Sequence, residues 1–253
     1  MPAYPMPVSI VTPVHNAART LTETIASIRA QDWTDWELWL VDDHSGDGSA
    51  AIITEAVTAD PRIHALSLSG PTGAAAARNA GIAAARGRYI AFLDADDLWD
   101  PGKLSAQIPV LEGGAGFVFA AYRRMDADGH YLSTVTVPER VDYTRALAGN
   151  PIGCLTAIYD SARYGKVPMP DLPRRQDYAL WLQLLRQHGP AIGIQTPLAS
   201  YRVQPGSLSA NKLMAARATW TVLRDCEGLP LPQAAWSFTQ YASNAILARL
   251  IRN

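Results

Sequence analysis

Three aspartates lie close together, directly after an apolar segment. Asp94, Asp96 and Asp97 follow the run 88–93, and in an extended strand the side chains of Asp94 and Asp96 point to the same face. Like charges at this spacing repel each other, and a divalent cation removes the repulsion. Mg²⁺ sites often combine one or two carboxylates with substrate phosphates. We therefore expect a Mg²⁺ or Mn²⁺ site at this position.

An acidic turn that caps the next helix is the alternative reading of the same segment. Asp100 fits a cap well, because proline, here Pro101, is favoured at the first helical position. We expect Asp100 to act only as a cap. Asp94 and Asp96 directly follow a hydrophobic strand, and this favours a functional role for them.

A second acidic pair, Asp42 and Asp43, ends the apolar segment 37–41. An aspartate at this position can close a turn by accepting a hydrogen bond from the backbone. Alternatively, one of the two carboxylates accepts a hydrogen bond from a nucleobase or a ribose. The residues alone leave both possibilities open.

Predicted strands and helices alternate through the first hundred residues. Apolar and β-branched segments predict strands at 8–12, 37–41, 63–68 and 88–94. Helices are expected from a capping box between Thr20 and Glu23, from an alanine-rich stretch up to about residue 60, and over 74–86. This alternation predicts an α/β fold with a mostly parallel sheet covered on both faces. Ligands of such sheets bind outside the carboxyl ends of the strands, where the acidic pairs lie.

The regular alternation ends after residue 100. We expect a strand at 116–121, loops and short strands over 122–170, a helix at 176–188 and an extended segment at 198–203. Further helices are predicted over 212–225 and 233–252. We expect one two-lobed domain that divides into the segments 1–100 and 101–210, followed by C-terminal helices at 211–253.

Composition excludes several classes of protein. The chain has 253 residues and a net charge of −1, so no overall positive field attracts nucleic acid. Cys154 and Cys226 are too few for a disulfide scaffold or a cysteine zinc site. We find no signal peptide and no apolar run of roughly 18 residues that would span a membrane. A cytoplasmic protein, soluble or bound to a membrane surface, is expected.

Several short motifs in a fixed order resemble the family 2 glycosyltransferases of the GT-A fold. They are VSIVTPVHN at 8–16, QDW at 31–33, WEL at 36–38, VDDHSGDGS at 41–49, ARNAGI at 77–82, GRYIAFLDADDLW at 87–99, QDYALWL at 176–182 and YRVQPGSLS at 201–209. Each motif is weak alone, but their order and spacing are specific. The resemblance implies a Rossmann-like sheet with a smaller acceptor-side lobe. Residues 1–100 would then be the nucleotide-sugar-binding half and residues 101–210 the acceptor-side half of one GT-A domain.

The resemblance also implies roles for individual residues. Pro13 and Asp43 would hold the nucleobase, usually uracil, and Arg78 would lie near the phosphates. Asp94 would approach the ribose and the metal, and Asp96 would ligate the metal directly. Asp177 would be the catalytic base of an inverting enzyme. Without the resemblance, Asp177 reads as a helix N-terminal residue favoured by the dipole, and Arg78 as an exposed helix arginine.

The sequence departs from the family pattern at two positions. Gln176 precedes Asp177 where the family often has glutamate, and Gln204 stands where it often has histidine. The base assignment is retained because Asp177 is present. An amide oxygen is a weaker partner for a metal or a diphosphate than an imidazole, so we do not expect Gln204 to contact the ligand.

The resulting hypothesis is an inverting glycosyltransferase that uses Mn²⁺ or Mg²⁺. It would move a sugar from a nucleotide diphosphate to an acceptor hydroxyl, and UDP is the favoured nucleotide. The acceptor would be a saccharide or a lipid-linked sugar in cell-surface polysaccharide or glycolipid synthesis. The alternatives are a catalytically silent nucleotide-sugar-binding module and a sugar nucleotidyltransferase. The nucleotidyltransferase reading is disfavoured because the segment 13–20 has no glycine. The helix at 233–252 could contact a membrane surface, although packing against the body or a second subunit is favoured.

Overall fold

The computed structural model describes residues 7–204 and 212–250. One ten-stranded sheet runs through this part of the chain, in the order β3-β2-β1-β4-β9-β6-β10-β5, with β7 beside β6 and β8 beside β10. The strands are β1 (Val8–Val14), β2 (Trp36–Asp42), β3 (Ile63–Ser67), β4 (Tyr89–Phe92), β5 (Leu98–Trp99), β6 (Phe117–Met125), β7 (Tyr131–Val135), β8 (Arg140–Val141), β9 (Ile158–Asp160) and β10 (Ala191–Arg202).

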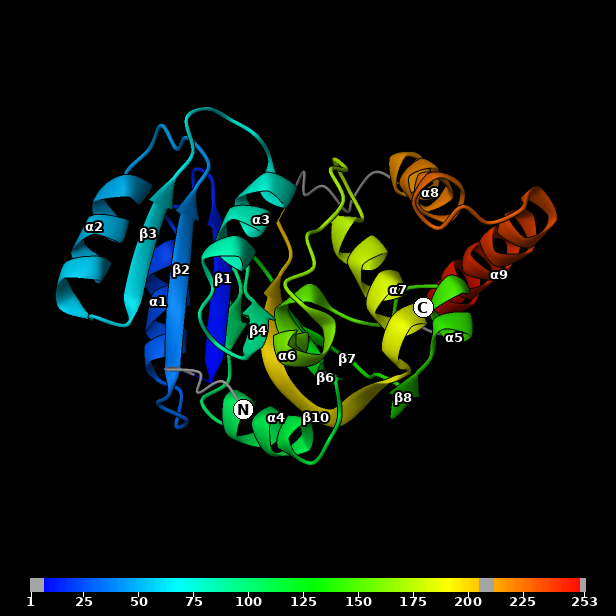
Figure 1. Ribbon diagram of the computed structural model, residues 1–253. Coiled ribbons are helices and arrows are strands. Elements are labelled where there is room, and N and C mark those ends of the chain that lie inside the picture. The colour runs from blue at the N-terminus through cyan, green and yellow to red at the C-terminus, as the bar shows by residue number, and fades with distance from the viewer. Residues whose placement is uncertain (1–6, 205–211, 251–253) are drawn as a thin grey trace.

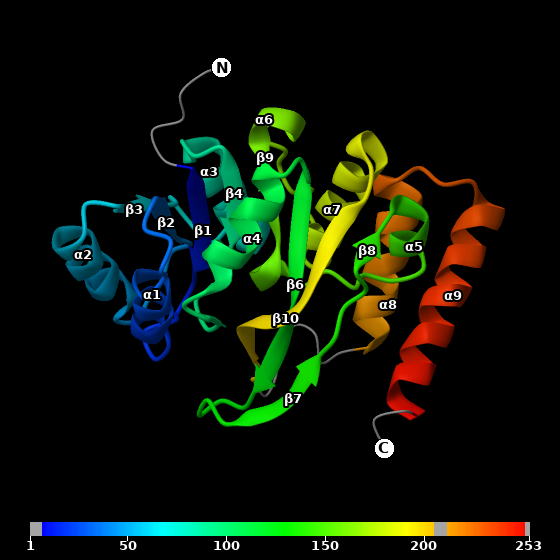
Figure 2. The same ribbon diagram turned by 90° about the horizontal axis from the view of Figure 1, so that it is seen from below.

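Helices connect these strands and cover both faces of the sheet (Figures 1 and 2). They are α1 (Leu21–Arg29), α2 (Ser49–Ala59), α3 (Ala74–Ala84), α4 (Lys103–Glu112), α5 (Tyr143–Leu147), η1 (Cys154–Thr156), α6 (Ser161–Tyr164), α7 (Gln176–His188), α8 (Lys212–Thr221), η2 (Val222–Cys226) and α9 (Leu231–Leu250). The turn η1 is a 3₁₀ helix and η2 is a π-helical turn that continues α8.

The first half of the sheet is parallel and the second half is mixed. Strands β3, β2, β1 and β4 run in the same direction, as strands joined by crossover helices do. Strand β9 then pairs antiparallel with both β4 and β6, and β10 runs parallel to β6. The α/β fold with a mostly parallel sheet is therefore confirmed, and one sheet extends through both predicted halves.

Two hydrophobic cores lie on opposite faces of this sheet. Alternation along β1 sends Ile10 into the core beneath α1, α2 and α4, and Val11 into the core beneath α3 and α7. The second core contains the fully buried Trp181, which packs on Phe92 and Phe117. The indole of Trp181 is thus part of the core and is not available to stack on a ligand.

Gly81 allows helix α3 to pack directly on β1. A Cβ atom at this position would lie 2.5 Å from Cγ1 of Val11, closer than van der Waals contact permits. The helix therefore approaches the sheet closely, and Arg78, three residues earlier on α3, is buried with 6 % exposure. The alternative interpretation of Arg78 as an exposed helix arginine is wrong for this reason.

Two predicted helix caps are also wrong, because each side chain has a partner distant in sequence. Thr20 precedes α1 but makes no capping hydrogen bond, and its hydroxyl donates to the carbonyl of Ala95 at 2.9 Å. Asp100 does not cap α4, whose N-cap is Gly102, and its carboxylate instead pairs with Arg123 at 2.7 Å.

Most predicted elements are found with shifted ends. The helix at 176–188 has the predicted bounds, whereas the strands at 116–121 and 198–203 belong to the longer β6 and β10. The end of the YRVQPGSLS motif, residues 205–209, lies outside the described residues, as do the side chains of α9 beyond residue 244. Among the described helices, none is both long and apolar enough to cross a membrane.

Candidate functional site

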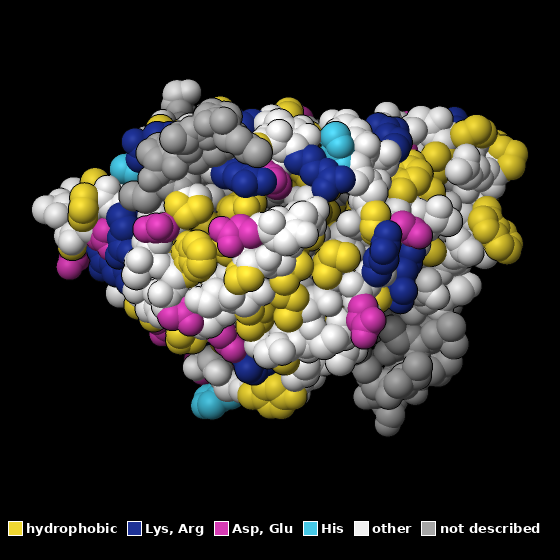
Figure 3. Space-filling view, turned by 60° about the horizontal axis from the view of Figure 1, so that its bottom comes forward, with side chains coloured by type: hydrophobic (Ala, Val, Ile, Leu, Met, Phe, Trp, Pro, Cys, Tyr) yellow, Lys and Arg dark blue, Asp and Glu magenta, His cyan; other side chains and the backbone are white. Residues whose placement is uncertain are grey.

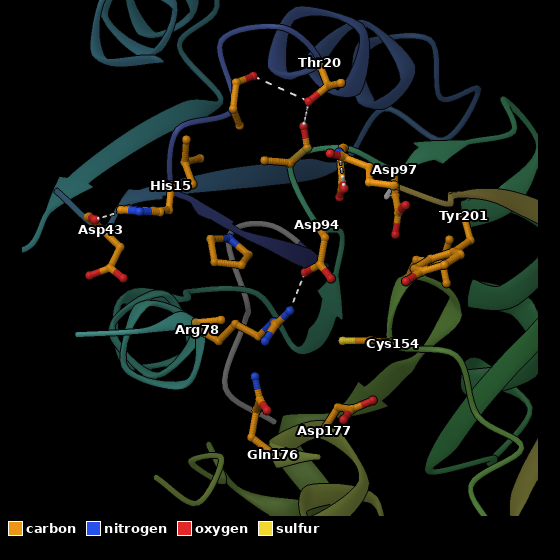
Figure 4. Close-up of a pocket in the computed structure, with 18 of the residues that line it drawn as sticks. His15, Thr20, Asp43, Arg78, Asp94, Asp97, Cys154, Gln176, Asp177 and Tyr201 are labelled. Carbon is orange, nitrogen blue, oxygen red and sulfur yellow. Dashed lines mark hydrogen bonds and ion pairs between the residues drawn. The ribbon is translucent and has the colours of Figure 1, made fainter. Parts of the chain in front are cut away.

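A cavity of about 710 Å³ opens at the carboxyl ends of β1, β2 and β4. One wall carries Pro13, Asp43, Arg78, Asp94 and Asp96, and the opposite wall carries residues 153–155 and 173–177. All six residues singled out from the sequence therefore line one cavity, including Asp177. Figure 4 shows Gln176 and Asp177 facing Asp94 across it, with the Cys154 thiol between them.

Arg78 and Asp94 form an ion pair in the middle of this cavity. Burial alone would lower the pKa of Arg78, but the neighbouring carboxylate of Asp94 outweighs burial, and the pKa is raised. The Nε atom of Arg78 is shielded from solvent and has no hydrogen-bond partner among the described residues. The guanidinium is therefore fixed and charged, with one donor left for a ligand.

Asp94, Asp96 and Asp97 lie in a turn after β4, and not on the strand. The strand ends at Phe92, and the amide of Asp97 donates to the carbonyl of Asp94 at 3.1 Å. We predicted that alternation along a strand brings Asp94 and Asp96 to one face, and this is wrong because both residues lie beyond the end of the strand. The turn nevertheless brings all three aspartates to the cavity wall.

The three carboxylates repel one another when they are ionised. Burial raises the pKa of Asp96 to about 6, and the charge of Asp94 adds to this shift. Burial, followed by the charges of Asp96 and Asp94, also raises the pKa of Asp97, whose Oδ1 accepts the amide of Arg202 at 2.9 Å. Gln204 donates from Nε2 to Oδ2 of Asp96 at 2.8 Å. A cation at this turn would relieve the repulsion.

The two aspartates at the end of β2 have different roles. Asp42 accepts the amide of Ser45 at 3.1 Å and so closes a turn. Asp43 lines the cavity and accepts the amides of Thr72 and Gly73 at 2.7 and 2.8 Å. Burial would raise the pKa of Asp43, but these hydrogen bonds lower it. Its carboxylate is therefore charged and held in place.

Asp177 lies in the first turn of α7, partly buried in the cavity wall. Burial raises the pKa of Asp177, and the positive charge of Arg78 opposes this without cancelling it. Gln176 beside it is 8 % exposed. A carboxylate with a raised pKa accepts a proton more readily than an ordinary surface aspartate.

Sequence reasoning missed several residues of the cavity wall. Cys154, Tyr122, Arg174 and Arg175 line it, and burial raises the pKa of the Cys154 thiol. Arg174 and Arg175 directly precede the QDYALWL motif, and this position in the sequence could have identified them. Cys154 and Tyr122 come from η1 and β6, in a region where the sequence has no periodic pattern.

A second acidic group lies outside the cavity, in the hairpin between β6 and β7. The ligand atoms of Asp126, Asp128 and His130 lie within 4.8 Å of one another. Asp126 accepts the backbone amides of Asp128 and His130, both at 2.9 Å. These contacts close the hairpin turn, and the group has no further feature that points to a ligand.

Comparison with known proteins shows the family to which this chain belongs. The family model for glycosyl transferase family 2 matches residues 9–158. The TuaG glycosyltransferase of Bacillus subtilis, assigned to teichuronic acid biosynthesis, is 41 % identical over 245 residues, which cover 96 % of this chain and 97 % of TuaG. WfgD of Escherichia coli, a UDP-Glc:alpha-D-GlcNAc-diphosphoundecaprenol beta-1,3-glucosyltransferase, is 34 % identical over 226 residues, 88 % of each chain.

Two solved structures share the fold at 17 % identity. Staphylococcus aureus TarS, residues 1–349, in complex with UDP-GlcNAc, has a TM-score of 0.73 over 94 % of this chain and 72 % of its own. The mannosyltransferase PcManGT of Pyrobaculum calidifontis, in complex with GDP-Man and Mn²⁺, has a TM-score of 0.64 over 98 % of this chain and 76 % of its own. From its sequence, its GT-A fold and the family match, this chain belongs to glycosyltransferase family 2.

Proposed function

We propose that this glycosyltransferase moves a sugar from a nucleoside diphosphate to an acceptor hydroxyl with inversion at the anomeric carbon. UDP is the favoured donor nucleotide. One observation carries the proposal. Asp177 on α7 lines the same cavity as Asp94 and Asp96, on the opposite wall. A base on one side of the sugar and a leaving group on the other are what a single inverting displacement requires.

The donor would lie along the wall formed by β1, β2 and α3. Pro13 and Asp43 would hold the base, Asp94 the ribose and Arg78 the diphosphate. The charged state of Asp43 supports this, because a carboxylate fixed by two amides retains lone pairs for a base N–H. The choice of uridine is supported by WfgD, whose name specifies UDP-Glc, and by the UDP-GlcNAc complex of TarS.

The residues of the turn after β4 fit a divalent cation. The side chains of Asp94 and Asp96 offer only oxygen ligands, which Mg²⁺ and Mn²⁺ prefer. Burial raises the pKa of Asp96, and repulsion by Asp94 adds to this shift, so full ionisation of the pair is disfavoured without a cation. We propose that these two aspartates hold Mn²⁺ or Mg²⁺. When bound, the ion would neutralise charge on the leaving diphosphate.

Asp177 would accept the proton of the acceptor hydroxyl as that oxygen attacks. The raised pKa of Asp177 brings its basicity closer to the working pH, where a general base is most effective. Arg78 stabilises the charged form of Asp177 and so opposes the effect of burial on its pKa. Arg78 is paired with Asp94, and this pairing would keep the guanidinium beside the diphosphate of a bound donor.

The biological setting is proposed from the relatives. We propose that residues 1–100 bind the donor, that 101–210 bind a saccharide or lipid-linked acceptor, and that the enzyme works in the cytoplasm at the inner face of the membrane. TuaG and WfgD, assigned to teichuronic acid synthesis and to an undecaprenol-linked acceptor, support a role in cell-surface polysaccharide or glycolipid synthesis.

The C-terminal helices 211–253 would supply a contact surface. On α9, Leu231 is 60 % and Trp236 is 64 % exposed, and Figure 3 shows apolar side chains at the edge of the molecule over these helices. We propose that this surface meets a second copy of the chain or the membrane. Flotation with lipid vesicles and the oligomeric state in solution separate the two, and a monomer that does not float contradicts both.

The Asp177→Asn variant tests the function. It should bind UDP as the wild type does but transfer sugar at least about 10²-fold more slowly, the usual contribution of a general base. The same loss should appear for every acceptor that the wild type uses. Unchanged turnover would remove Asp177 from the mechanism, and loss of UDP binding would show that the variant has lost the donor site instead.

A further inference from the structure

Two adjacent arginines at the acceptor wall form no ion pair with any residue that the structure describes. Arg174 and Arg175 line the cavity directly before α7. On the donor wall, Arg78 is neutralised by Asp94. Neither Arg174 nor Arg175 forms an ion pair with any described residue. The charge of Arg175 helps to lower the pKa of Asp177, but two positive charges face one carboxylate on this side of the cavity.

Arg174 has an unsatisfied donor within the protein. Its Nη1 atom is shielded from solvent and has no hydrogen-bond partner among the described residues. Its Nη2 atom meets only the sulfur of Met214, a weak acceptor, at 3.8 Å. Nearly all buried polar atoms in native proteins are satisfied, so an exception of this kind calls for a partner. For a guanidinium, the matching partner is a planar or tetrahedral oxyanion.

Arg175 is held in an uncommon conformation beside it. Its φ of 65° lies in the left-handed region, where bulky residues are rare. The guanidinium donates to the hydroxyl of Tyr241 at 3.1 Å and lies 5.7 Å from the centre of the tyrosine ring. Tyr241 orients the group but carries no negative charge that would neutralise it. The amides at the N-terminus of α7 add further positive potential.

The position of the pair identifies which substrate would use it. Asp177, the proposed base for the acceptor hydroxyl, follows Arg175 by two residues, whereas the donor diphosphate is assigned to Arg78 and the turn after β4. We propose that Arg174 and Arg175 bind a phosphate or diphosphate carried by the acceptor, an inference that rests on the proposed function. The acceptor sugar would span the space between this anion and Asp177. The diphosphate in the name of the WfgD substrate is an anion of this class.

A binding experiment tests the pair without needing the acceptor sugar. Protein saturated with UDP and excess Mn²⁺ is titrated with pentyl diphosphate, and with pentanol as the phosphate-free counterpart. The wild type should bind pentyl diphosphate in preference to pentanol. Arg174→Gln should weaken this binding about tenfold, and a second change, Arg175→Gln, should weaken it further. Arg174→Lys keeps the charge without the planar fork and should recover part of the affinity.

Arg145→Gln is the matched control, because Arg145 is exposed on α5, outside the cavity, and its loss changes net charge equally. This variant should bind pentyl diphosphate as the wild type does. Equal binding by wild type and Arg174→Gln would overturn the inference, as would loss of pentyl diphosphate binding once UDP occupies the protein. UDP affinity is measured in the same series, so a failure of the donor site appears separately from a failure of the arginine pair.

Discussion

The amide of Gln204 donates a hydrogen bond of 2.8 Å to the carboxylate of Asp96. The sequence suggested no ligand contact for Gln204, and the structure gives it a different task. It fixes the orientation of an aspartate that is proposed to hold the metal. Partners that orient metal ligands in this way are worth about 10–100-fold in metal affinity.

Removal of this hydrogen bond should therefore raise the requirement for metal. For Gln204→Ala, the Mn²⁺ concentration that half-saturates activity is expected to rise at least about tenfold, with little change at saturating Mn²⁺. A titration of activity against Mn²⁺ measures this. Gln195→Ala, at an exposed position on β10, serves as the control. An identical Mn²⁺ dependence in Gln204→Ala and the wild type would show that the contact is without consequence for the metal.

The ionised side chain of Asp177, the proposed base, should lower the free energy of unfolding. Burial raises the pKa of Asp177, so the folded state binds its proton more tightly than the unfolded state. The ionised side chain therefore lowers stability as the pH rises from the ordinary aspartate range through the raised pKa. The ligand-free Asp177→Asn variant should have a higher unfolding midpoint than the wild type at about pH 7. This gain should shrink toward about pH 4.

Thermal unfolding at both pH values decides the point. A lower midpoint for Asp177→Asn at about pH 7 would mean that the carboxylate stabilises the fold, which contradicts a buried and partly uncompensated charge. Asp128→Asn, on the exposed hairpin turn, gives the effect of losing one negative charge elsewhere.

Glu37 should stabilise the fold away from the cavity. Its carboxylate accepts the Ser9 hydroxyl and the Arg86 amide, both at 2.6 Å, and Nε of Arg86 at 2.8 Å. Burial would raise the pKa of Glu37, but these hydrogen bonds lower it below the ordinary value of 4.5. Glu37→Gln should lose about 1–3 kcal/mol of unfolding free energy at neutral pH, the usual cost of unsatisfied buried partners.

The pH dependence of this loss has a defined sign. A lowered pKa contributes stability above the ordinary glutamate pKa, and the contribution disappears as the pH falls through the folded value. The difference between wild type and Glu37→Gln should therefore shrink in acid. Urea unfolding at about pH 7 and about pH 4 measures it. The exposed Glu55→Gln is the control, and a loss in Glu55→Gln as large as that in Glu37→Gln would contradict the account.

The sequence predicted the sheet and several residues that line the cavity, because both depend on local patterns. Apolar runs that end in polar residues identified the ends of β1, β2 and β4, and the short motifs pointed to Asp43, Arg78 and Asp94. The helix α7 was predicted with its observed ends because Gly189 and Pro190 stop it.

The failures share one physical cause, which is a partner far away in the chain. Thr20 bonds the carbonyl of Ala95 instead of its own helix, and Asp100 pairs with Arg123 from β6. Arg78 is buried because Gly81 lets its helix approach the sheet. No local pattern contains these contacts, and the cavity wall around Cys154 was missed for the same reason.

The most direct test of the account is the thermal stability of the wild type with UDP, in the presence and absence of Mn²⁺. Ligands that bind only the folded state raise the unfolding midpoint. We predict a rise with UDP that requires Mn²⁺, that is lost in Asp96→Asn and that persists in Asp128→Asn. If neither UDP nor GDP shifts the midpoint of the folded protein with Mn²⁺ present, or if the shift survives in Asp96→Asn, the proposed metal-bridged donor site is contradicted.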